Sequence, residues 1–402
     1  MKIVAGTDIV AGATKRTDAL VLPDYETVAL VLQGGGALGS YQAGVYEGLH
    51  AAGIRPNWYA GISIGAINVA LIAGNPPERR IGRLREFWET VCEPSFIPPI
   101  IDLQSLTRLL PLTDDFRTYA NALSAVRTIV QGQSGFFLPR VPPPWAQPPG
   151  SAGSTSYYDT SPLRATLERL VDFDLLNSAD LRVSVGAVSV TTGNFTYFDS
   201  ARIRIGPEHI MASGALPPGF PPVQIGDDCY WDGGLVSNTP LMHVLEAGPR
   251  RDTLAFQVDL WSASGPQPQH IFDAMERQKD IQYSSRTRMV TDAALYAQKL
   301  RRAILKLCEQ LPAEARADPE VIELADLACS KVYNVIHLIY RAKVALGEAK
   351  DYEFGLATMR DHWAAGGADI ARTLARPEWL QRPSAEQGVV THDIHRIEPS
   401  AP

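Results

Sequence analysis

Cysteine is scarce in this chain and follows no pattern. The 402 residues contain four cysteines, Cys92, Cys229, Cys308 and Cys329. No two of them form a CxxC pair or stand at the spacing of metal ligands. This distribution argues against a disulfide framework and against a metal site. We therefore expect buried thiols in a reducing compartment, and neither a metal nor another cofactor.

The chain also lacks a long apolar run. Hydrophobic residues make up 45% of the chain, but no run of about 18 consecutive residues is apolar throughout. The sequence therefore predicts no membrane span. The first residues, MKIVAGTDIVAGATKRTD, place Asp8 inside their only apolar patch and lack the core of a secretory signal. We expect a soluble, cytoplasmic protein whose contact with membranes, if it has one, is peripheral.

An excess of positive charge is missing as well. Lysine and arginine number 37 and the acidic residues 44, which gives a formal net charge of -7 at pH 7. Nucleic acids and anionic lipid surfaces select basic proteins. The charge balance therefore gives no support for a nucleic-acid partner or for broad attraction to anionic lipid.

Glycine, in contrast, is abundant, and six of the 32 glycines lie in two short loops. The first loop, Gln33–Gly39, follows an apolar strand at 28–32 and precedes a helix from about Ser40. A glycine-rich turn at a helix start presents unpaired backbone N–H groups, which suit an anion or the oxyanion of an acyl-transfer intermediate.

The second loop places a serine between two glycines. A strand at 58–62 leads through Gly61-Ile62-Ser63-Ile64-Gly65 into a helix from about Ala66. Glycine permits the tight strand-to-helix turn that holds a nucleophile out of a sheet. Ser63 is therefore the candidate nucleophile.

The spacing Gly34-x-Gly36-x-x-Gly39 also fits a dinucleotide-binding fingerprint. That fold places an acidic residue about twenty positions further on, at the end of the second strand. Here the chain reads Ile54-Arg55-Pro56-Asn57, and its second strand ends in Gly-Ile-Ser. The dinucleotide interpretation is therefore disfavoured.

Composition divides the chain into four parts. We expect an arm at 1–25, a catalytic domain at 26–262, a mainly helical domain at 263–380 and a tail at 381–402. The catalytic domain carries a proline-rich insert at 93–156 with short helices at 103–130. Long irregular inserts are often functional, so this one is either a lid over the site or a loop packed on the surface.

Periodicity and turn residues predict the remaining elements. Helices are expected at 79–92, from about 161 to 170, at 271–311, at 319–330 and at 356–374. Strands are expected at 182–191 and 195–198, as a hairpin around the turn at 192–194, and at 254–260 and 333–340. A second hairpin is expected at 223–231, with its tip at 226–228.

Four motifs together resemble those of the patatin-like phospholipases. They are Gln33–Gly39, Gly61–Gly65, Ala212-Ser213 with Phe220-Pro221-Pro222, and Asp232-Gly233-Gly234. They occur in the family's order between about Val28 and Leu260. The region from about Ile271 to Leu374 resembles an uncharacterised carboxy-terminal domain of some bacterial members.

The resemblance implies a three-layer α/β/α fold and hydrolysis of acyl esters by a serine–aspartate dyad. In that case Ser63 is the nucleophile and Asp232 the general base. The N–H groups of Gly34, Gly35 and Gly36 form the oxyanion hole, and Gly39 permits close helix packing. Many members have Arg or Lys where this chain has Leu38, which removes one electrostatic contact with a phosphorylated head group.

Asp232 is the weak point of such a dyad. An aspartate of pKa near 3.9 is a poor base for a serine hydroxyl, but partial burial raises that pKa. Taken alone, Asp232-Gly233 is also a common turn pair. A triad with His209 or His243 is the alternative, and only His243 fits the hydrolase order Ser, Asp, His. All eight histidines are otherwise expected to be structural.

Three functions fit these residues. The first is a serine acyl hydrolase, acting through a covalent acyl-enzyme on lipid or other hydrophobic acyl esters. The second transfers the acyl group to an acceptor other than water. The third is a non-catalytic acyl-binding scaffold whose helical carboxy-terminal part binds a partner. Exposed helical stripes in that part also suggest self-association into a homo-oligomer.

Overall fold

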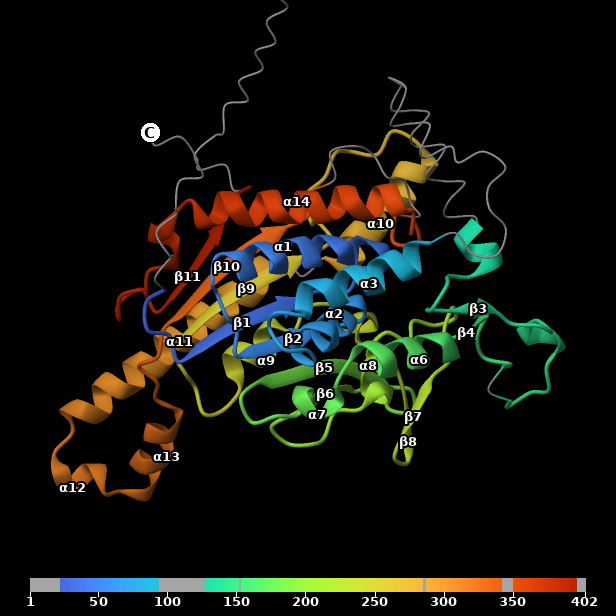
Figure 1. Ribbon diagram of the computed structural model, residues 1–402. Coiled ribbons are helices and arrows are strands. Elements are labelled where there is room, and N and C mark those ends of the chain that lie inside the picture. Colours follow the sequence, from blue (N-terminus) through green and yellow to red (C-terminus); the bar gives the residue numbers. More distant parts are fainter. Residues whose placement is uncertain (1–21, 94–126, 152, 285–286, 342–349, 396–402) are drawn as a thin grey trace, which may run out of the picture.

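A computed structural model describes residues 22–93, 127–151, 153–284, 287–341 and 350–395. A mixed nine-stranded sheet forms the centre, in the order β11-β10-β9-β1-β2-β5-β8-β7, with β6 paired to β5 (Figure 1). Its strands are β1 Thr27–Leu32, β2 Trp58–Gly61, β5 Arg182–Ser189, β6 Phe195–Asp199, β7 Val223–Ile225, β8 Asp228–Asp232, β9 Thr253–Asp259, β10 Tyr333–Ile339 and β11 Val389–Asp393. A small sheet pairs β3 Leu138–Pro139 with β4 Tyr158–Asp159.

The centre of the sheet is parallel, and this brings the two glycine loops together. β1 pairs in parallel with β2 and β9, and Leu32 lies opposite Gly61 and Val258. The carboxyl ends of these strands therefore meet at one edge, where ligands bind in open α/β sheets. The hairpins β5–β6 and β7–β8 are antiparallel, as the turn residues predict.

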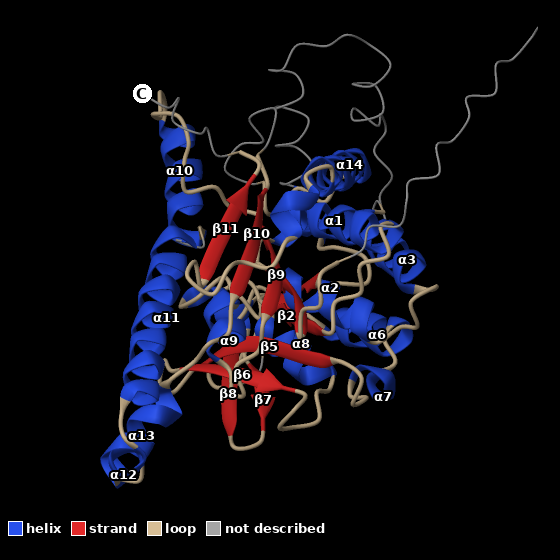
Figure 2. Cartoon of the chain, turned by 90° about the vertical axis from the view of Figure 1, so that its left-hand side faces the viewer, coloured by secondary structure: helices blue, strands red, loops and turns tan. Residues whose placement is uncertain are grey.

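Helices cover both faces of the sheet. On one face lie α1 Ser40–Ala51, α2 Ile64–Ala73, α3 Arg80–Cys92, α6 Ser161–Leu170, α7 Phe173–Leu176, α8 Pro207–Ser213 and α14 Leu356–Leu374, and on the other α9 Leu241–Glu246 and α11 Thr287–Gln310 (Figure 2). Alternate residues of β1 belong to the two cores: Leu30 and Leu32 to the first, Ala29 and Val31 to the second. The chain thus has the predicted three-layer α/β/α fold.

The carboxy-terminal region contributes to the same sheet. β10 pairs in parallel with β9, and β11 with β10. α14 packs on α1 at glycines: a Cβ on Gly44 would lie 1.9 Å from the Trp363 carbonyl oxygen, and one on Gly366 2.1 Å from that of Tyr41. The expected boundary at residue 262 therefore falls inside one continuous sheet, and β11 lies within the expected tail.

Some element bounds differ from the sequence-based expectation. Residues 271–311 form two helices, α10 Ile271–Tyr283 and α11, because the chain turns extended at Ser284. α2 begins at Ile64, two positions before Ala66. The other short helices are α12 Ala313–Arg316, α13 Pro319–Leu327, and the 3-10 turns Gly36–Gly39, Pro144–Ala146, Gly233–Leu235 and Pro377–Leu380.

The amino-terminal arm and the insert are described only in part. At the end of the arm, Tyr25 is buried and its hydroxyl donates to the Gln381 carbonyl over 3.0 Å. Most of the short helices predicted at 103–130 lie outside the described residues, as does most of the arm.

Candidate active site

A cavity of about 340 Å³ lies at the edge of the sheet where the glycine loops meet. Ser63, Asp232 and the three glycines at 34–36 all line it. Most of the other lining side chains are apolar or aromatic: Ile64, Ile67, Ile129, Phe136, Phe137, Tyr157, Tyr158, Leu216, Pro218, Phe220, Trp261, Tyr283, Tyr352 and Phe354. A mostly apolar cavity with a few polar groups is the usual form of a small-molecule site.

Ser63 occupies a strained turn between β2 and α2. Its φ of 55° and ψ of -126° make it the one non-glycine residue with positive φ among those the structure describes. Such strain is concentrated at functional sites. The turn needs both flanking glycines, because a Cβ on Gly61 would lie 2.5 Å from the backbone of Gly65, and one on Gly65 2.4 Å from the Leu32 carbonyl oxygen.

Ser213 holds this turn in place from α8. The Ser63 N–H donates to both the carbonyl and the hydroxyl oxygen of Ser213, each at 3.1 Å. The Ser213 hydroxyl in turn donates to the Gly186 carbonyl over 2.7 Å. In the sequence analysis Ser213 is named only as part of a motif, and no role is predicted for it. Its contact with Ser63 depends on the tertiary fold, which places α8 beside the turn.

Asp232 lies at the end of β8 and lines the same cavity as Ser63. The Gly234 N–H donates to Asp232 Oδ1 over 2.7 Å. Burial raises the pKa of Asp232 to about 7, against the lowering effects of Ser63 and of the Gly234 N–H. Gly233 is required beside it, since a Cβ there would lie 2.6 Å from the Gly186 carbonyl oxygen.

The three glycines of the first loop differ in their backbone bonding. The Gly34 N–H donates to the Asn238 carbonyl over 3.3 Å. The N–H groups of Gly35 and Gly36 donate to no backbone carbonyl among the described residues. Gly36 has a φ of 54°. Within the described part of the chain, the N–H groups of Gly35 and Gly36 are therefore free of backbone acceptors, whereas that of Gly34 is engaged.

The first loop is held by side chains for which the sequence analysis predicted no role. The buried Gln33 accepts from the N–H groups of Leu260 and Trp261, at 2.6 and 3.0 Å. The Gly34 carbonyl accepts from Trp261 Nε1 at 2.8 Å and from Asn238 Nδ2 at 3.1 Å. A glutamine at the end of a buried strand was the only sequence signal for this role. The last glycine, Gly39, packs on Ile64, which would lie 2.5 Å from a Cβ there.

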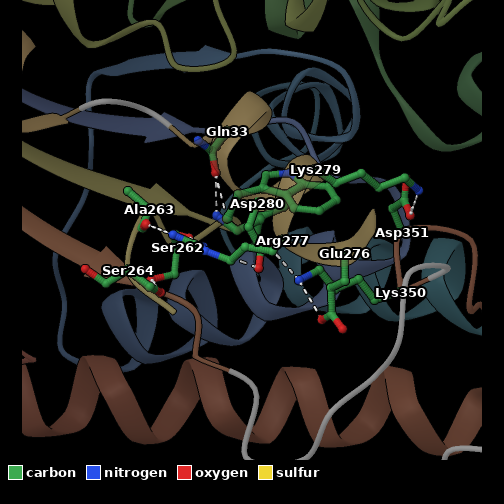
Figure 3. A network of polar contacts seen from close by, with 12 residues as sticks. Gln33, Ser262, Ala263, Ser264, Glu276, Arg277, Lys279, Asp280, Lys350 and Asp351 are labelled. Carbon is green, nitrogen blue, oxygen red and sulfur yellow. Dashed lines mark hydrogen bonds and ion pairs between the residues drawn. The ribbon is translucent and has the colours of Figure 1, made fainter. Parts of the chain in front are cut away.

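The carboxy-terminal region forms one wall of the cavity. The Asp351 carbonyl accepts from the Ala37 N–H over 2.9 Å, and Tyr352 and Phe354 line the cavity. Figure 3 shows ion pairs fixing this segment to α10: Lys279 Nζ lies 2.9 Å from Asp351 Oδ1, and Lys350 Nζ 2.5 Å from Asp280 Oδ1. Burial raises the pKa of Asp351 despite Lys279. Sequence periodicity gave no sign that this segment reaches the site.

The end of the proline-rich insert supplies aromatic side chains to the cavity. Phe136 and Phe137 line it together with Tyr158 and Phe220, and the Phe137 ring lies 4.7 Å from that of Tyr158 and 5.1 Å from that of Phe220. Phe136 and Phe137 thus bring part of the insert to the site.

The two histidines considered for a triad lie elsewhere. His209 Nδ1 accepts from the Gly206 N–H at 2.9 Å. His243 Nε2 lies 3.1 Å from Asp199 Oδ2, and its ring stacks on Tyr197. No histidine is among the described residues that line the cavity.

Comparison with known proteins identifies the family. A patatin-like phospholipase family model matches residues 30–245, more than half of the chain, and a second model, described as patatin phospholipase, matches residues 281–386. The α/β/α fold agrees with this match, and the family model supports lipid acyl-ester hydrolysis as the class of activity. The chain belongs to the patatin-like phospholipase family.

Solved structures resemble the chain more distantly, each at 13% identity. VipD from Legionella pneumophila has a TM-score of 0.35, with 91% of this chain and 72% of that chain covered. The type III effector ExoU has 0.32, with 89% and 54% covered. Human GIVD cytosolic phospholipase A2 has 0.34, with 90% and 60% covered. A search of curated proteins found no match.

Among the residues that the structure describes, no helix combines the length and the apolar character needed to cross a bilayer.

Proposed function

We propose that the chain is a serine acyl hydrolase that cleaves lipid acyl esters through Ser63 and Asp232. The observation that carries the proposal is one cavity lined by a serine on a strained turn, a buried carboxylate and the glycine loop. Burial raises the pKa of that carboxylate, Asp232, to about 7. A base with a pKa near the working pH is suited to accept a serine proton.

The reaction follows from the positions of these groups. Ser63 Oγ attacks the ester carbonyl carbon while Asp232 accepts the hydroxyl proton. The N–H groups of Gly35 and Gly36 stabilise the oxyanion, and Gly34 supports the loop through its own hydrogen bonds. Asp232 then returns the proton to the leaving alcohol. Water, deprotonated by Asp232, then attacks the acyl-enzyme carbonyl. The bond to Ser63 Oγ breaks, Asp232 returns the proton to Ser63 Oγ, and the fatty acid is released.

The nature of the cavity supports a hydrophobic acyl chain as its occupant. Its lining is largely aromatic and aliphatic, and among the described lining residues there is no lysine or arginine. Leu38 is buried and offers no charge to a head group. The phosphate of a phospholipid thus finds no cationic partner on these walls, so selectivity for an anionic head group is not expected from them.

Covalent labelling tests the nucleophile directly. We expect a fluorophosphonate probe to label one serine, located at Ser63 by peptide mass spectrometry, in protein that also hydrolyses p-nitrophenyl esters. Labelling elsewhere, or lipid binding without labelling, contradicts the proposal and favours the acyl-binding scaffold. Product analysis with alcohol and thiol acceptors separates hydrolysis from acyl transfer.

The pH dependence tests the base. Because Asp232 must be ionised to accept the proton and its pKa is about 7, we expect kcat/KM to fall about tenfold per pH unit below pH 7. Circular dichroism at each pH serves as the control for unfolding. A kcat/KM that is constant between pH 5 and 8 in folded protein excludes Asp232 as the base.

We further propose a cytoplasmic location, with peripheral contact at a membrane that supplies the substrate. The insert at 93–156 is proposed as a lid, because its described end already contributes Phe136 and Phe137 to the cavity. No metal or cofactor has a role in this mechanism, since the proton, nucleophile and oxyanion donors all come from the chain.

A further inference from the structure

The outer face of α11 carries an exposed apolar stripe. Its large members are 61% exposed at Met289, 66% at Tyr296, 47% at Leu300 and 63% at Leu307. Exposed Ala293 and Ala303 complete it. These residues follow one another at steps of four and three, the spacing of a coiled-coil seam. The stripe is about 27 Å long at 1.5 Å per residue.

The opposite face of α11 is anchored, so the stripe has a fixed orientation. Ala294 is buried in the core beneath the sheet. Gln298 Nε2 donates to the carbonyls of Cys329 and Lys331 at 3.2 and 2.6 Å, and Arg301 pairs with Glu246 of α9 at 2.5 Å. Figure 2 shows α11 along the outside of the molecule, so its free face points away from the sheet.

The order of side chains in the stripe is self-complementary. When two copies of α11 run antiparallel about a twofold axis level with Gln298, Met289 meets Leu307 of the partner subunit and Tyr296 meets Leu300 of the partner subunit. Ala293 meets Ala303 of the partner subunit, and these small side chains let the two helix backbones approach each other. A lipid surface requires no such matching of large with large and small with small.

The flanking charges fit the same arrangement. Asp292 lies beside the stripe near one end and Lys306 near the other, and both are exposed. In the antiparallel pair, each Asp292 lies beside Lys306 of the partner subunit. Lys299 approaches its own counterpart at the axis, so two favourable contacts oppose one unfavourable contact.

From this self-complementarity we infer that the chain forms a homodimer through an antiparallel pair of α11 helices. One helix pair of this length buries less than the roughly 1,200–2,000 Å² of a stable interface. The dimer therefore has a Kd in the micromolar range and forms independently of the proposed catalytic chemistry.

Sedimentation of the full chain tests the dimer. At protein concentrations of about 1 to 100 μM, we expect the wild type to show a monomer–dimer equilibrium. For Leu300→Asp we expect the Kd of the dimer to increase about 100-fold, because two buried leucines are lost per dimer. Leu324→Asp, at a leucine that is 49% exposed on α13, is the matched control and leaves the Kd unchanged. A wild type that stays monomeric throughout overturns the proposal.

Cysteine cross-linking tests the direction of the helices. In a background with Cys229→Ser and Cys308→Ser, a mixture of Ala293→Cys and Ala303→Cys chains forms a disulfide-linked dimer on mild oxidation, whereas neither variant cross-links with itself. Parallel helices give the reverse pattern. That result, or absence of cross-linking in every mixture, contradicts the antiparallel pair.

Lys299→Gln separates the dimer from a membrane-binding surface. Removing the like-charge contact at the axis tightens the dimer, whereas removing a lysine weakens binding to anionic vesicles. The same variant is therefore measured by sedimentation and by co-pelleting with phosphatidylserine vesicles. A Kd that rises, together with weaker co-pelleting, identifies α11 as a lipid-facing helix and overturns the inference.

Discussion

Ser63→Ala is expected to lower kcat/KM for p-nitrophenyl esters by about 10⁴-fold or more, because the acyl-enzyme needs the Ser63 hydroxyl. The cavity and the N–H groups of Gly35 and Gly36 remain in this variant, so substrate binding persists while turnover stops. Ester hydrolysis under single-turnover conditions measures the loss. Ser264→Ala, at an exposed serine outside the cavity, is the matched control and retains activity.

The same position tests the backbone strain. With φ at 55°, any residue with a Cβ is strained at position 63, whereas glycine is not. Ser63→Gly is therefore expected to be as inactive as Ser63→Ala but more stable by about 1 kcal/mol. Equal denaturation midpoints for the two variants argue against strain at this turn, and measurable turnover in both excludes Ser63 as the nucleophile.

Asp232→Asn is expected to remove the general base and to increase stability at alkaline pH. The amide keeps the shape of the carboxylate and can still accept from the Gly234 N–H, but it takes no proton from Ser63. We expect a loss in kcat/KM of about 10³- to 10⁴-fold. Activity close to that of the wild type in the folded variant removes Asp232 from the mechanism.

The stability effect follows from the raised pKa. Folding raises the pKa of Asp232 from 3.8 to about 7, so between these values the folded state binds more protons than the unfolded state. This group therefore makes the wild type less stable as pH rises from about 4 to 7, by up to about 4 kcal/mol, with the full loss present above pH 7. Asp232→Asn escapes that loss.

Thermal unfolding at pH 5 and pH 8 measures this difference. The Tm of Asp232→Asn minus that of the wild type is expected to be larger at pH 8. Asp227→Asn, at the exposed tip of the β7–β8 hairpin, is the control and shows no such change between the two pH values. A difference that is the same at both pH values means that Asp232 is ionised equally easily in the folded and unfolded states.

The local parts of the site could be predicted from the sequence. Glycine at 61 and 65 permits one tight turn around Ser63, and an apolar run at 28–32 forms a buried strand in most contexts. The helix predicted at 356–374 has the same bounds in the structure. These features depend on residues close together in the chain, where backbone sterics and periodicity decide the conformation.

Contributions from distant segments could not be predicted in this way. Asp351, Tyr352 and Phe354 reach the cavity because β10 extends the sheet and α14 packs on α1, and neither contact has a local signal. The Gly34 N–H likewise donates to the Asn238 carbonyl only because the fold brings together two loops that lie 204 residues apart in the sequence.

The sequence by itself determined the strand–loop–helix units, the serine on its turn and the aspartate beside two glycines. These follow from short-range sterics and from the spacing of apolar residues. Folding places Asp232 in a buried position beside Ser63, where its pKa is near 7, and it brings the carboxy-terminal segment to one wall of the cavity. Burial and desolvation depend on everything that packs around a group, and this packing is a property of the folded chain.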